Sequence, residues 1–563
     1  MRPQNLLLTG LVIALILLCV QPVLADFGLS VPSTDVSIWT TALAWLVPVG
    51  LGLLACGTVA PGRVATVIRL GWLALGIATI VYWLYGFAFQ FGGVGFISEV
   101  PGLSGLAREW SWRPWDEMWG TQWGIIGLTG YVLSEPAATE AARALFFAQL
   151  PWITTAVAIP LWSLQGRTKP IVLVLSGLLT ASLFALIGNW SWGGGWLANL
   201  GLNLGLGHGF VDLGGAGAIH LAGAASALAG MLAFGTRARA HRGPEQLALP
   251  TLEATTVQAQ IADDGETYVP MPPLHLPLLA TLGVWLALVG LLGWMANTPA
   301  RLTAALAVSQ VDMGIGLLLA AAGGALTTLA FSWLTTGQGN ALMVARGVLG
   351  ALVAASSGQP FLPLWAMLAV GAAAGLLVPL VQYLIEHLLR LDDPTSAVAT
   401  HGTSALWGLL AVGIFAGGHV DGGSIAGLIH GEWGQFRAQA TGAATIAVAS
   451  FCVSWLLFAA VQGLTRAWQG EYTIRLPRRP RARPKSTHKT TRRGPRIRFA
   501  RAQEENVSKT ETTGAAVEAE VPAAVETETS EAEAETAPIM PEQAPSEPLE
   551  DIEPPPDAPQ DEG

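Results

Sequence analysis

The sequence has little charge. Only 12% of its 563 residues are charged, whereas 52% are hydrophobic. A soluble globular chain carries about 25% charged residues. Because many stretches run for a membrane-spanning length with almost no charge, the composition excludes an ordinary soluble domain. It predicts an all-α polytopic membrane protein.

Cysteine is also scarce, with only Cys19, Cys56 and Cys452 in the chain. They form no Cys–His cluster with zinc spacing, and we expect no structural disulfide. No serine, cysteine or carboxylate nucleophile recurs in a triad-like pattern. We therefore expect neither a metal nor another cofactor, and we do not expect an enzyme.

The formal net charge of −10 belongs to a tail. Residues 503–563 hold eighteen Asp and Glu against one Lys, whereas residues 475–501 hold twelve Lys and Arg. We interpret 471–502 as a basic juxtamembrane segment and 503–563 as an acidic tail, both predicted to be disordered. The basic segment is suited to anionic lipid rather than to nucleic acid.

The N-terminus predicts a signal peptide over residues 1–25. Arg2 precedes an apolar run, and Val23-Leu24-Ala25 resembles a cleavage site before Asp26. An uncleaved first helix is the alternative interpretation. The transmembrane domain is then predicted over residues 26–470.

Eleven apolar segments follow. They are predicted near residues 37–59, 64–91, 140–164, 170–190, 214–235, 274–296, 307–335, 340–358, 362–388, 394–417 and 440–467. Cleavage leaves the N-terminus outside, so an odd number of spans places the C-terminus inside. Arg and Lys gather in the loops expected to be cytoplasmic, which agrees with the positive-inside rule.

Eleven divides into five, five and one. Residues 226–235 and 404–413, in segments five and ten, are identical at most positions, and each run follows a histidine. A five-helix repeat is odd, so its two copies must be inverted in the membrane, which places a site at the repeat interface near the midplane. Chance similarity between helices rich in Ala, Gly and Leu is the alternative.

Two histidines occupy matched places in these segments. His220 lies eight residues after Asp212, and His401 lies about eight residues after Asp392 and Asp393. At 1.5 Å per residue, each lies about 12 Å deep, from opposite faces of a core about 30 Å thick. A histidine inside a membrane is expensive, so either the two form one site or each bonds separately to a neighbouring helix.

A neutral histidine pair can share a proton, with one ring nitrogen donating and the other accepting. Such a pair suits a small substrate that can lose a proton, such as ammonium. A bare cation pays a large desolvation cost in an apolar pore, whereas the deprotonated molecule is neutral. Trp190, Trp192 and Trp196 flank a glycine turn near the outer end, where an indole face attracts a cation. Asp212 is either a helix cap, a source of negative potential, or both.

A further group of tryptophans lies in the loop at residues 105–123. An interfacial aromatic belt is one interpretation, and a vestibule role is the other.

These residues resemble the ammonium transporter family (Amt/Mep/Rh), over about residues 35–470. The resemblance rests on Trp-Gly-Gly-Gly at 192–195, Asp-x7-His at 212–220 and Asp-Asp-Pro-x6-His-Gly at 392–402. It implies an eleven-helix inverted-repeat fold, usually trimeric, with one pore per subunit. It also implies that Trp192 recruits ammonium, Asp212 supports that site, and His220 and His401 are the twin histidines of the pore.

The chain departs from the family pattern at several positions. The family's outer phenylalanine gate corresponds to Leu150, with Phe146 one turn before it, and to Trp294. Ser396 replaces a frequent aspartate, and Arg346 is an unusual charge in segment eight, explained by either a subunit interface or a carbonyl cluster. The tail lacks the family's usual cytoplasmic pattern, so a regulatory cytoplasmic partner is not predicted from it.

The resemblance predicts an ammonium transporter of the plasma membrane in which ammonium is recruited at Trp192, deprotonated, and passed along the histidine pair. Two alternatives stay open: an ammonium sensor that signals through the tail, and a channel for a neutral solute or gas.

Overall fold

The structure is a computed structural model that describes residues 38–111, 123–235, 260–261, 267–268, 275–298, 309–420 and 423–469. All of them belong to one compact unit, Met1–Arg498. The predicted signal peptide, the basic segment and the acidic tail lie outside the described residues, as does most of the tryptophan-rich loop.

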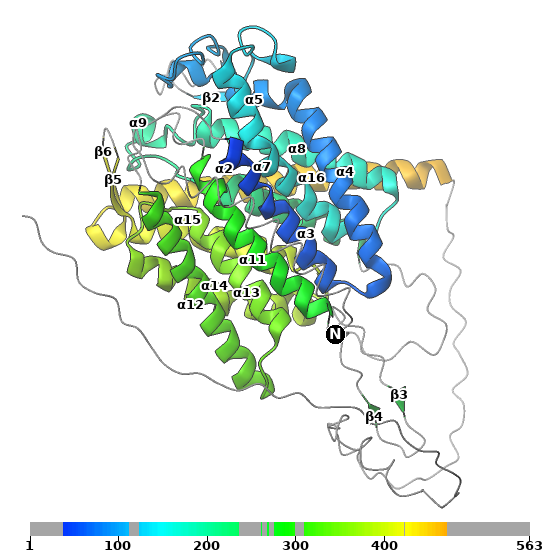
Figure 1. The fold of residues 1–563 in the computed structure, drawn as a ribbon. Coiled ribbons are helices and arrows are strands. Elements are labelled where there is room, and N and C mark those ends of the chain that lie inside the picture. The colour runs from blue at the N-terminus through cyan, green and yellow to red at the C-terminus, as the bar shows by residue number, and fades with distance from the viewer. Residues whose placement is uncertain are drawn as a thin grey trace, which may run out of the picture. The chain divides into compact units, whose positions relative to one another are not determined.

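Long apolar helices make up most of the described chain (Figure 1). Those before residue 236 are α2 (Ile38–Ala44), α3 (Leu46–Thr58), α4 (Val64–Val81), α5 (Phe87–Phe91), α7 (Glu140–Leu164), α8 (Pro170–Trp192), α9 (Leu200–Leu204) and α10 (Ala222–Phe234), with π-helical turns η2 (Tyr82–Gly86) and η5 (Ala216–Leu221). Those after it are α11 (His275–Ala296), α12 (Gln310–Thr336), α13 (Ala341–Ser356), α14 (Leu364–Tyr383), α15 (Ser404–Phe415) and α16 (Trp433–Gln469), with π-helical turns η8 (Leu384–Leu388) and η9 (Ala397–Thr403).

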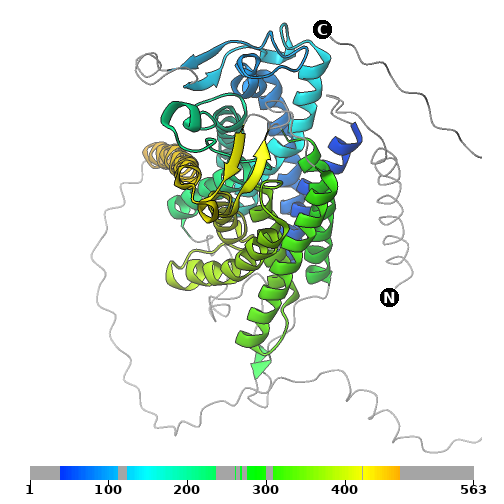
Figure 2. The same ribbon diagram turned by 90° about the vertical axis from the view of Figure 1, so that its left-hand side faces the viewer.

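The remaining elements are short and lie in connections. They are four 3₁₀ turns, η1 (Pro61–Arg63), η3 (Val94–Phe96), η4 (Tyr131–Leu133) and η10 (Leu428–His430), and three antiparallel strand pairs, β1 (Glu109–Ser111) with β2 (Gly124–Gly127), β3 (Gln260–Ile261) with β4 (Thr267–Tyr268), and β5 (Gly417–Val420) with β6 (Gly423–Ala426). Figure 2 shows the β5–β6 pair beside the helices.

The sequence defines the helix ends locally. The Thr139 hydroxyl accepts the Ala142 N–H at the start of α7, and the Asn340 side chain accepts two backbone N–H groups at the start of α13. Pro170 is the first residue of α8, where its missing N–H costs nothing. Gly337 ends α12 in the left-handed conformation.

The predicted fold class is confirmed: the chain is an α-helical polytopic membrane protein. In the described part of the chain, ten helices are long and apolar enough to cross a membrane, and Ala341–Ser356 is a shorter apolar helix. Each of the eleven predicted segments coincides with one of these. The largest shift is in the last, which begins at Trp433 rather than near residue 440. The N-out, C-in orientation stays a prediction.

The helices pack in two similar groups. In the first group α4, α7 and α8 contact one another and α10 packs on α7; in the second, α12, α13 and α14 contact one another and α15 packs on α13. The groups meet where α3 lies along α11 and where η5 contacts η9 (Figure 1). The contacts among α4, α7, α8 and α10 thus correspond to those among α12, α13, α14 and α15, as expected for a five-helix repeat.

Glycine lets the two groups approach closely. A Cβ on Gly50 of α3 would collide with the backbone carbonyl of Gly283 in α11, and a Cβ on Gly283 would collide with that of Gly50. Small residues at a helix crossing allow such backbone contact in a membrane protein.

The last helix, α16, supports the chain just before His220. It has 37 residues, or about 55 Å at 1.5 Å per residue, and packs on α10 and α15. The Gln439 side chain accepts the Val211 N–H at 2.7 Å and donates to the Val211 carbonyl at 2.8 Å. The segment leading to Asp212 is therefore fixed from outside the repeat.

Candidate functional site

Two backbone turns of the same design lead into the histidine-bearing helices. The first turn is residues 212–215 and the second turn is residues 393–396. Each ends in a left-handed residue, Gly215 at φ 80° and Ser396 at φ 54°, and each is followed by a π-helical turn. Each turn carries an aspartate and directly precedes the π-helical turn that contains a histidine, His220 or His401.

An aspartate caps each π-helical turn. Oδ2 of Asp212 accepts the N–H groups of Gly217 at 3.0 Å and Ala218 at 2.9 Å. Oδ2 of Asp393 accepts the N–H of Val398 at 2.9 Å. Asp393, eight residues before His401, is therefore the counterpart of Asp212. From the sequence, Asp392 and Asp393 were predicted as one feature. In the structure Asp393 caps the turn, whereas Asp392 pairs with Arg167.

His220 and His401 meet at the interface of the two groups. Their Nδ1 atoms lie 3.0 Å apart, and the ring planes differ by 6°. The side chains are 4% and 7% exposed. One Nδ1 must carry the proton and the other must accept it, so the neutral pair contains one ring of each tautomer. The interpretation of two separate histidines is wrong, because the rings are in hydrogen-bonding contact.

Trp192 and Asp212 form the neighbouring part of the site. The indole Nε1 of Trp192 donates to the backbone carbonyl of Asp212 at 2.7 Å. Both side chains are buried. Among the described residues, Oδ1 of Asp212 is a buried atom with no hydrogen-bond partner. Burial raises the pKa of Asp212 to about 6, although the backbone N–H groups that it accepts oppose this shift. Asp212 is thus both a helix cap and a carboxylate that titrates near neutrality.

The three residues predicted for the outer gate have different surroundings. Trp294 lies in the site, with its Nε1 donating to the Gly214 carbonyl at 3.0 Å. The ring stacked on it belongs to Trp152, at a centroid distance of 4.6 Å and an interplanar angle of 9°. Trp152 also contacts Trp192 edge-on at 5.5 Å. Leu150 is buried two residues earlier, and Phe146 stacks on Tyr82 at 5.2 Å.

Sequence reasoning therefore missed Trp152 as the partner of Trp294. The available signal was a large aromatic residue close to the predicted gate position: Trp152 lies two residues after Leu150, in the same helix. The sequence alone does not show which face of α7 turns Trp152 toward Trp294.

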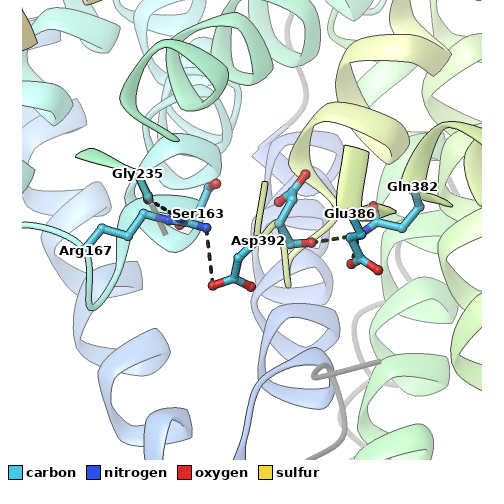
Figure 3. Close-up of polar contacts among 7 residues, drawn as sticks. Ser163, Arg167, Gly235, Gln382, Glu386 and Asp392 are labelled. Atoms are coloured by element: carbon cyan, nitrogen blue, oxygen red, sulfur yellow. Dashed lines mark hydrogen bonds and ion pairs between the residues drawn. The ribbon is translucent and has the colours of Figure 1, made fainter. Parts of the chain in front are cut away.

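The second turn is surrounded by charged side chains (Figure 3). Arg167 donates to the Gly235 carbonyl at 2.7 Å and pairs with Asp392 at 3.6 Å. Arg346 donates to the Pro394 carbonyl at 2.7 Å. Of the two explanations considered for Arg346, the structure shows the carbonyl contact.

A bundle of membrane-length helices with a buried polar site between two similar halves is typical of a membrane transporter. The chain belongs to the ammonium transporter family. The model of the "Ammonium Transporter Family" matches residues 36–256 and 270–466. The chain therefore transports ammonium across a membrane.

Individual relatives agree. The chain is 30% identical to "Ammonium transporter Amt2" of Archaeoglobus fulgidus over 352 residues, which cover 61% of this chain and 69% of the relative. It is 25% identical to "Ammonium transporter Amt1" of the same organism over 440 residues, 77% of this chain and 94% of the relative.

Solved structures show the same fold. A "Sensor Amt Protein" matches with a TM-score of 0.58 at 22% identity, covering 76% of this chain and 92% of its own. Mep2 of Candida albicans matches with a TM-score of 0.55 at 18% identity, covering 76% and 83%.

Proposed function

We propose that ammonium is recruited beside Trp192 and Asp212, loses its proton, and crosses as ammonia along the pair formed by His220 and His401. The 3.0 Å contact between the two Nδ1 atoms is the observation that carries this proposal. Because one ring carries its proton on Nδ1 and the other carries it on Nε2, one Nε2 atom can accept a proton and the other can donate one.

Charge explains why deprotonation precedes passage. The rings are buried, and the π-helical turns that carry them also carry buried apolar residues such as Ala216, Ile219 and Ala397. Moving a bare cation into such surroundings costs several kcal/mol unless it is fully coordinated. A neutral guest avoids that cost, while its proton can travel separately over the imidazoles.

Trp192 and Asp212 provide the place where the charge is still tolerated. An indole face attracts a small cation by up to about 2 kcal/mol when desolvated. The free Oδ1 of Asp212 adds negative potential close to the Trp192 ring, since Trp192 bonds to the same residue. Together they favour the cation before it reaches the histidines.

The stacked rings of Trp152 and Trp294 act as the gate in this proposal, in place of Leu150 and Phe146. Both indoles are fully buried and Trp152 touches Trp192. A guest leaving Trp192 must displace one of them. Phe146 and Leu150 then serve as the wall behind the gate.

The surroundings of the protein are part of the same proposal. We propose a homotrimer in the plasma membrane, with the N-terminus outside, a cleaved signal peptide and a cytoplasmic tail. Support comes from the exposed apolar side chains on several helices, such as Trp72, Trp285 and Leu334, which suit lipid or a neighbouring subunit. A regulatory cytoplasmic partner would bind the tail, after residue 470.

Reconstituted vesicles test the mechanism. Methylammonium uptake and membrane current are measured for the wild type, His220→Ala and His401→Ala, with the exposed His208→Ala as the matched control. We expect each pair variant to lose about 100-fold or more of the current, because a proton-transferring group commonly contributes that much. His208→Ala should behave as the wild type.

Three results would contradict the proposal. Unchanged current in His220→Ala would remove the histidine relay. Ammonia flux without charge movement in the wild type would favour a neutral-solute channel. Ligand binding without any flux would favour the sensor.

A further inference from the structure

The second turn is held from behind by side chains of α13 and α14. Nη2 of Arg346 donates to the Pro394 carbonyl at 2.7 Å, and Nε2 of Gln382 donates to the Asp393 carbonyl at 2.9 Å. Gln382 also contacts the Glu386 carboxylate (Figure 3). Two consecutive carbonyls of one turn are thereby fixed by two different helices.

The same contacts continue toward His401. The Ser396 hydroxyl donates to Oε1 of Gln382 at 2.7 Å, and the Thr400 hydroxyl donates to the Ser396 oxygen at 3.0 Å. Thr400 precedes His401 directly. Gln382 is therefore connected by hydrogen bonds to the residue next to the relay.

The turn needs this support because Ser396 is not glycine. Its φ of 54° is in the left-handed region, which costs a residue with a Cβ about 1–2 kcal/mol. Such a conformation persists when the surroundings over-determine it. Ser396 is fully buried, and its side-chain bond to Gln382 is one of those determinants.

Arg346 also interacts electrostatically with Asp393. Asp393 is fully buried, and among the described residues its Oδ1 is a buried atom with no hydrogen-bond partner. Burial raises the pKa of Asp393, while the N–H groups of Val398 and Ala397, and then Arg167 and Arg346, oppose that shift. The guanidinium of Arg346 thus favours the ionised Asp393 that caps the π-helical turn.

We propose that Arg346 and Gln382 are positioning residues that hold the second turn and thereby set the ring of His401 against His220. Neither residue touches the histidine rings in the contacts described above. The inference rests on the proposed relay for its consequence on transport, although its structural part does not depend on that relay.

Two variants test it, Arg346→Gln and Gln382→Ala. Each is labelled with ¹⁵N-histidine and placed in lipid nanodiscs, where the chemical shifts report the tautomers and the inter-ring hydrogen bond. Arg69→Gln is the matched control, because Arg69 is an exposed arginine on α4 that bonds locally, to Thr66. Arg346→Lys is the conservative variant.

We expect Arg346→Gln and Gln382→Ala to change the His401 signals and to lower the maximal rate of methylammonium uptake. The rate should fall about tenfold or more, since small misplacements remote from the reacting atoms have effects of this size. KM should change by less than about twofold, because Trp192 and the first turn are untouched. Arg346→Lys should recover part of both, and Arg69→Gln should change neither.

Unchanged histidine signals in the two variants would overturn the proposal, even if uptake fell. If Arg346→Gln does not yield folded protein by gel filtration, the neutral Gln382→Ala decides the question alone. A wild type without flux would contradict the proposed function, while the histidine signals would still decide whether these residues position the ring.

Discussion

The two turns solve the same backbone problem with different side chains. In the first turn, neutral donors hold the carbonyls: Trp192 on Asp212, Thr298 on Leu213 at 2.5 Å, and Trp294 on Gly214. In the second turn, Gln382 and Arg346 do so, with Glu386 beside Gln382. The first set also includes the residues proposed to handle the substrate.

This difference separates two tasks. The first turn is held by the indoles of Trp192 and Trp294, and Trp192 is also the residue proposed to recruit ammonium, so support and recruitment share residues. The second turn has Arg167 and Arg346 beside it, and these cations face the carboxylates of Asp392, Asp393 and Glu386, so its charges pair with one another. We infer that the first turn is shaped for the entry of ammonium and the second for holding His401 while a neutral guest passes.

Removal of the two aspartates should break the comparison most clearly. We expect Asp393→Ala to lower the free energy of unfolding by about 3 kcal/mol, because Arg346 loses a compensating charge in a buried place. Asp212→Ala should cost only about 1–2 kcal/mol, the usual value of a lost cap. Thermal unfolding in detergent micelles measures both.

The control for this prediction is the Arg346→Gln background. There, Asp393→Ala should cost less than in the wild type, because Arg346 no longer loses a compensating charge and Arg167 remains as a cation near Asp393. An equal loss for Asp393→Ala in both backgrounds would show that Arg346 and Asp393 do not depend on one another.

Acid should affect the first turn through Asp212. Its pKa of about 6 means that the carboxylate is largely charged at pH 7 and protonated at pH 5. We expect ammonium uptake to fall about tenfold between these values, since one pH unit below the pKa leaves about one carboxylate in ten ionised. Uptake by vesicles at fixed ammonium concentration measures this.

Stability should change in the opposite direction. Because the folded-state pKa of Asp212 is raised above the ordinary value of 3.8, the ionised carboxylate destabilises the fold at neutral pH. That cost is relieved as the pH falls through 6. Asp212→Asn should remove both effects, and a variant that kept the acid decline in uptake would assign it to other groups.

The sequence predicted most of what depends on local composition. Hydropathy located the membrane helices, because each long apolar run must bury its backbone polar groups as a helix. Equal depths of about 12 Å from opposite faces placed His220 and His401 near the midplane, whereas their contact is known only from the structure. Trp192 and Asp212 also proved to be neighbours.

What it did not predict depends on how separate helices rotate against each other. The stacking of Trp152 on Trp294 depends on how α7 and α11 are each rotated within the bundle. Asp392 and Asp393 are adjacent in the chain, yet Asp392 pairs with Arg167 while Asp393 accepts the Val398 N–H, and the sequence pattern does not distinguish the two. Gln382 and Arg346 lie 11 and 48 residues from the carbonyls that they bind, and no local pattern marks them.

A smaller effect is expected at Trp192 itself. Trp192→Phe keeps an aromatic face but loses the 2.7 Å bond to Asp212. A lost hydrogen bond of this kind costs about 1 kcal/mol, so KM for methylammonium should rise about fivefold. Trp190→Phe is the control, since it loses a similar bond, to the Ile125 carbonyl at 2.9 Å, outside the proposed site. Equal KM values for the two variants would argue against recruitment at Trp192.

Exchange of the two left-handed residues compares the turns directly, and the smallest effect of all is expected at Ser396. Gly215→Ala should destabilise the protein by about 1–2 kcal/mol, because a Cβ there would collide with the Ile219 side chain at a φ of 80°. Ser396→Gly should be nearly neutral. Relief of the left-handed strain, about 1–2 kcal/mol, is offset by the two lost bonds, to Gln382 and Thr400, worth about 1 kcal/mol each. A strong stabilisation by Ser396→Gly in thermal unfolding would mean that those bonds contribute little, and that Gln382 supports the second turn through the Asp393 carbonyl alone.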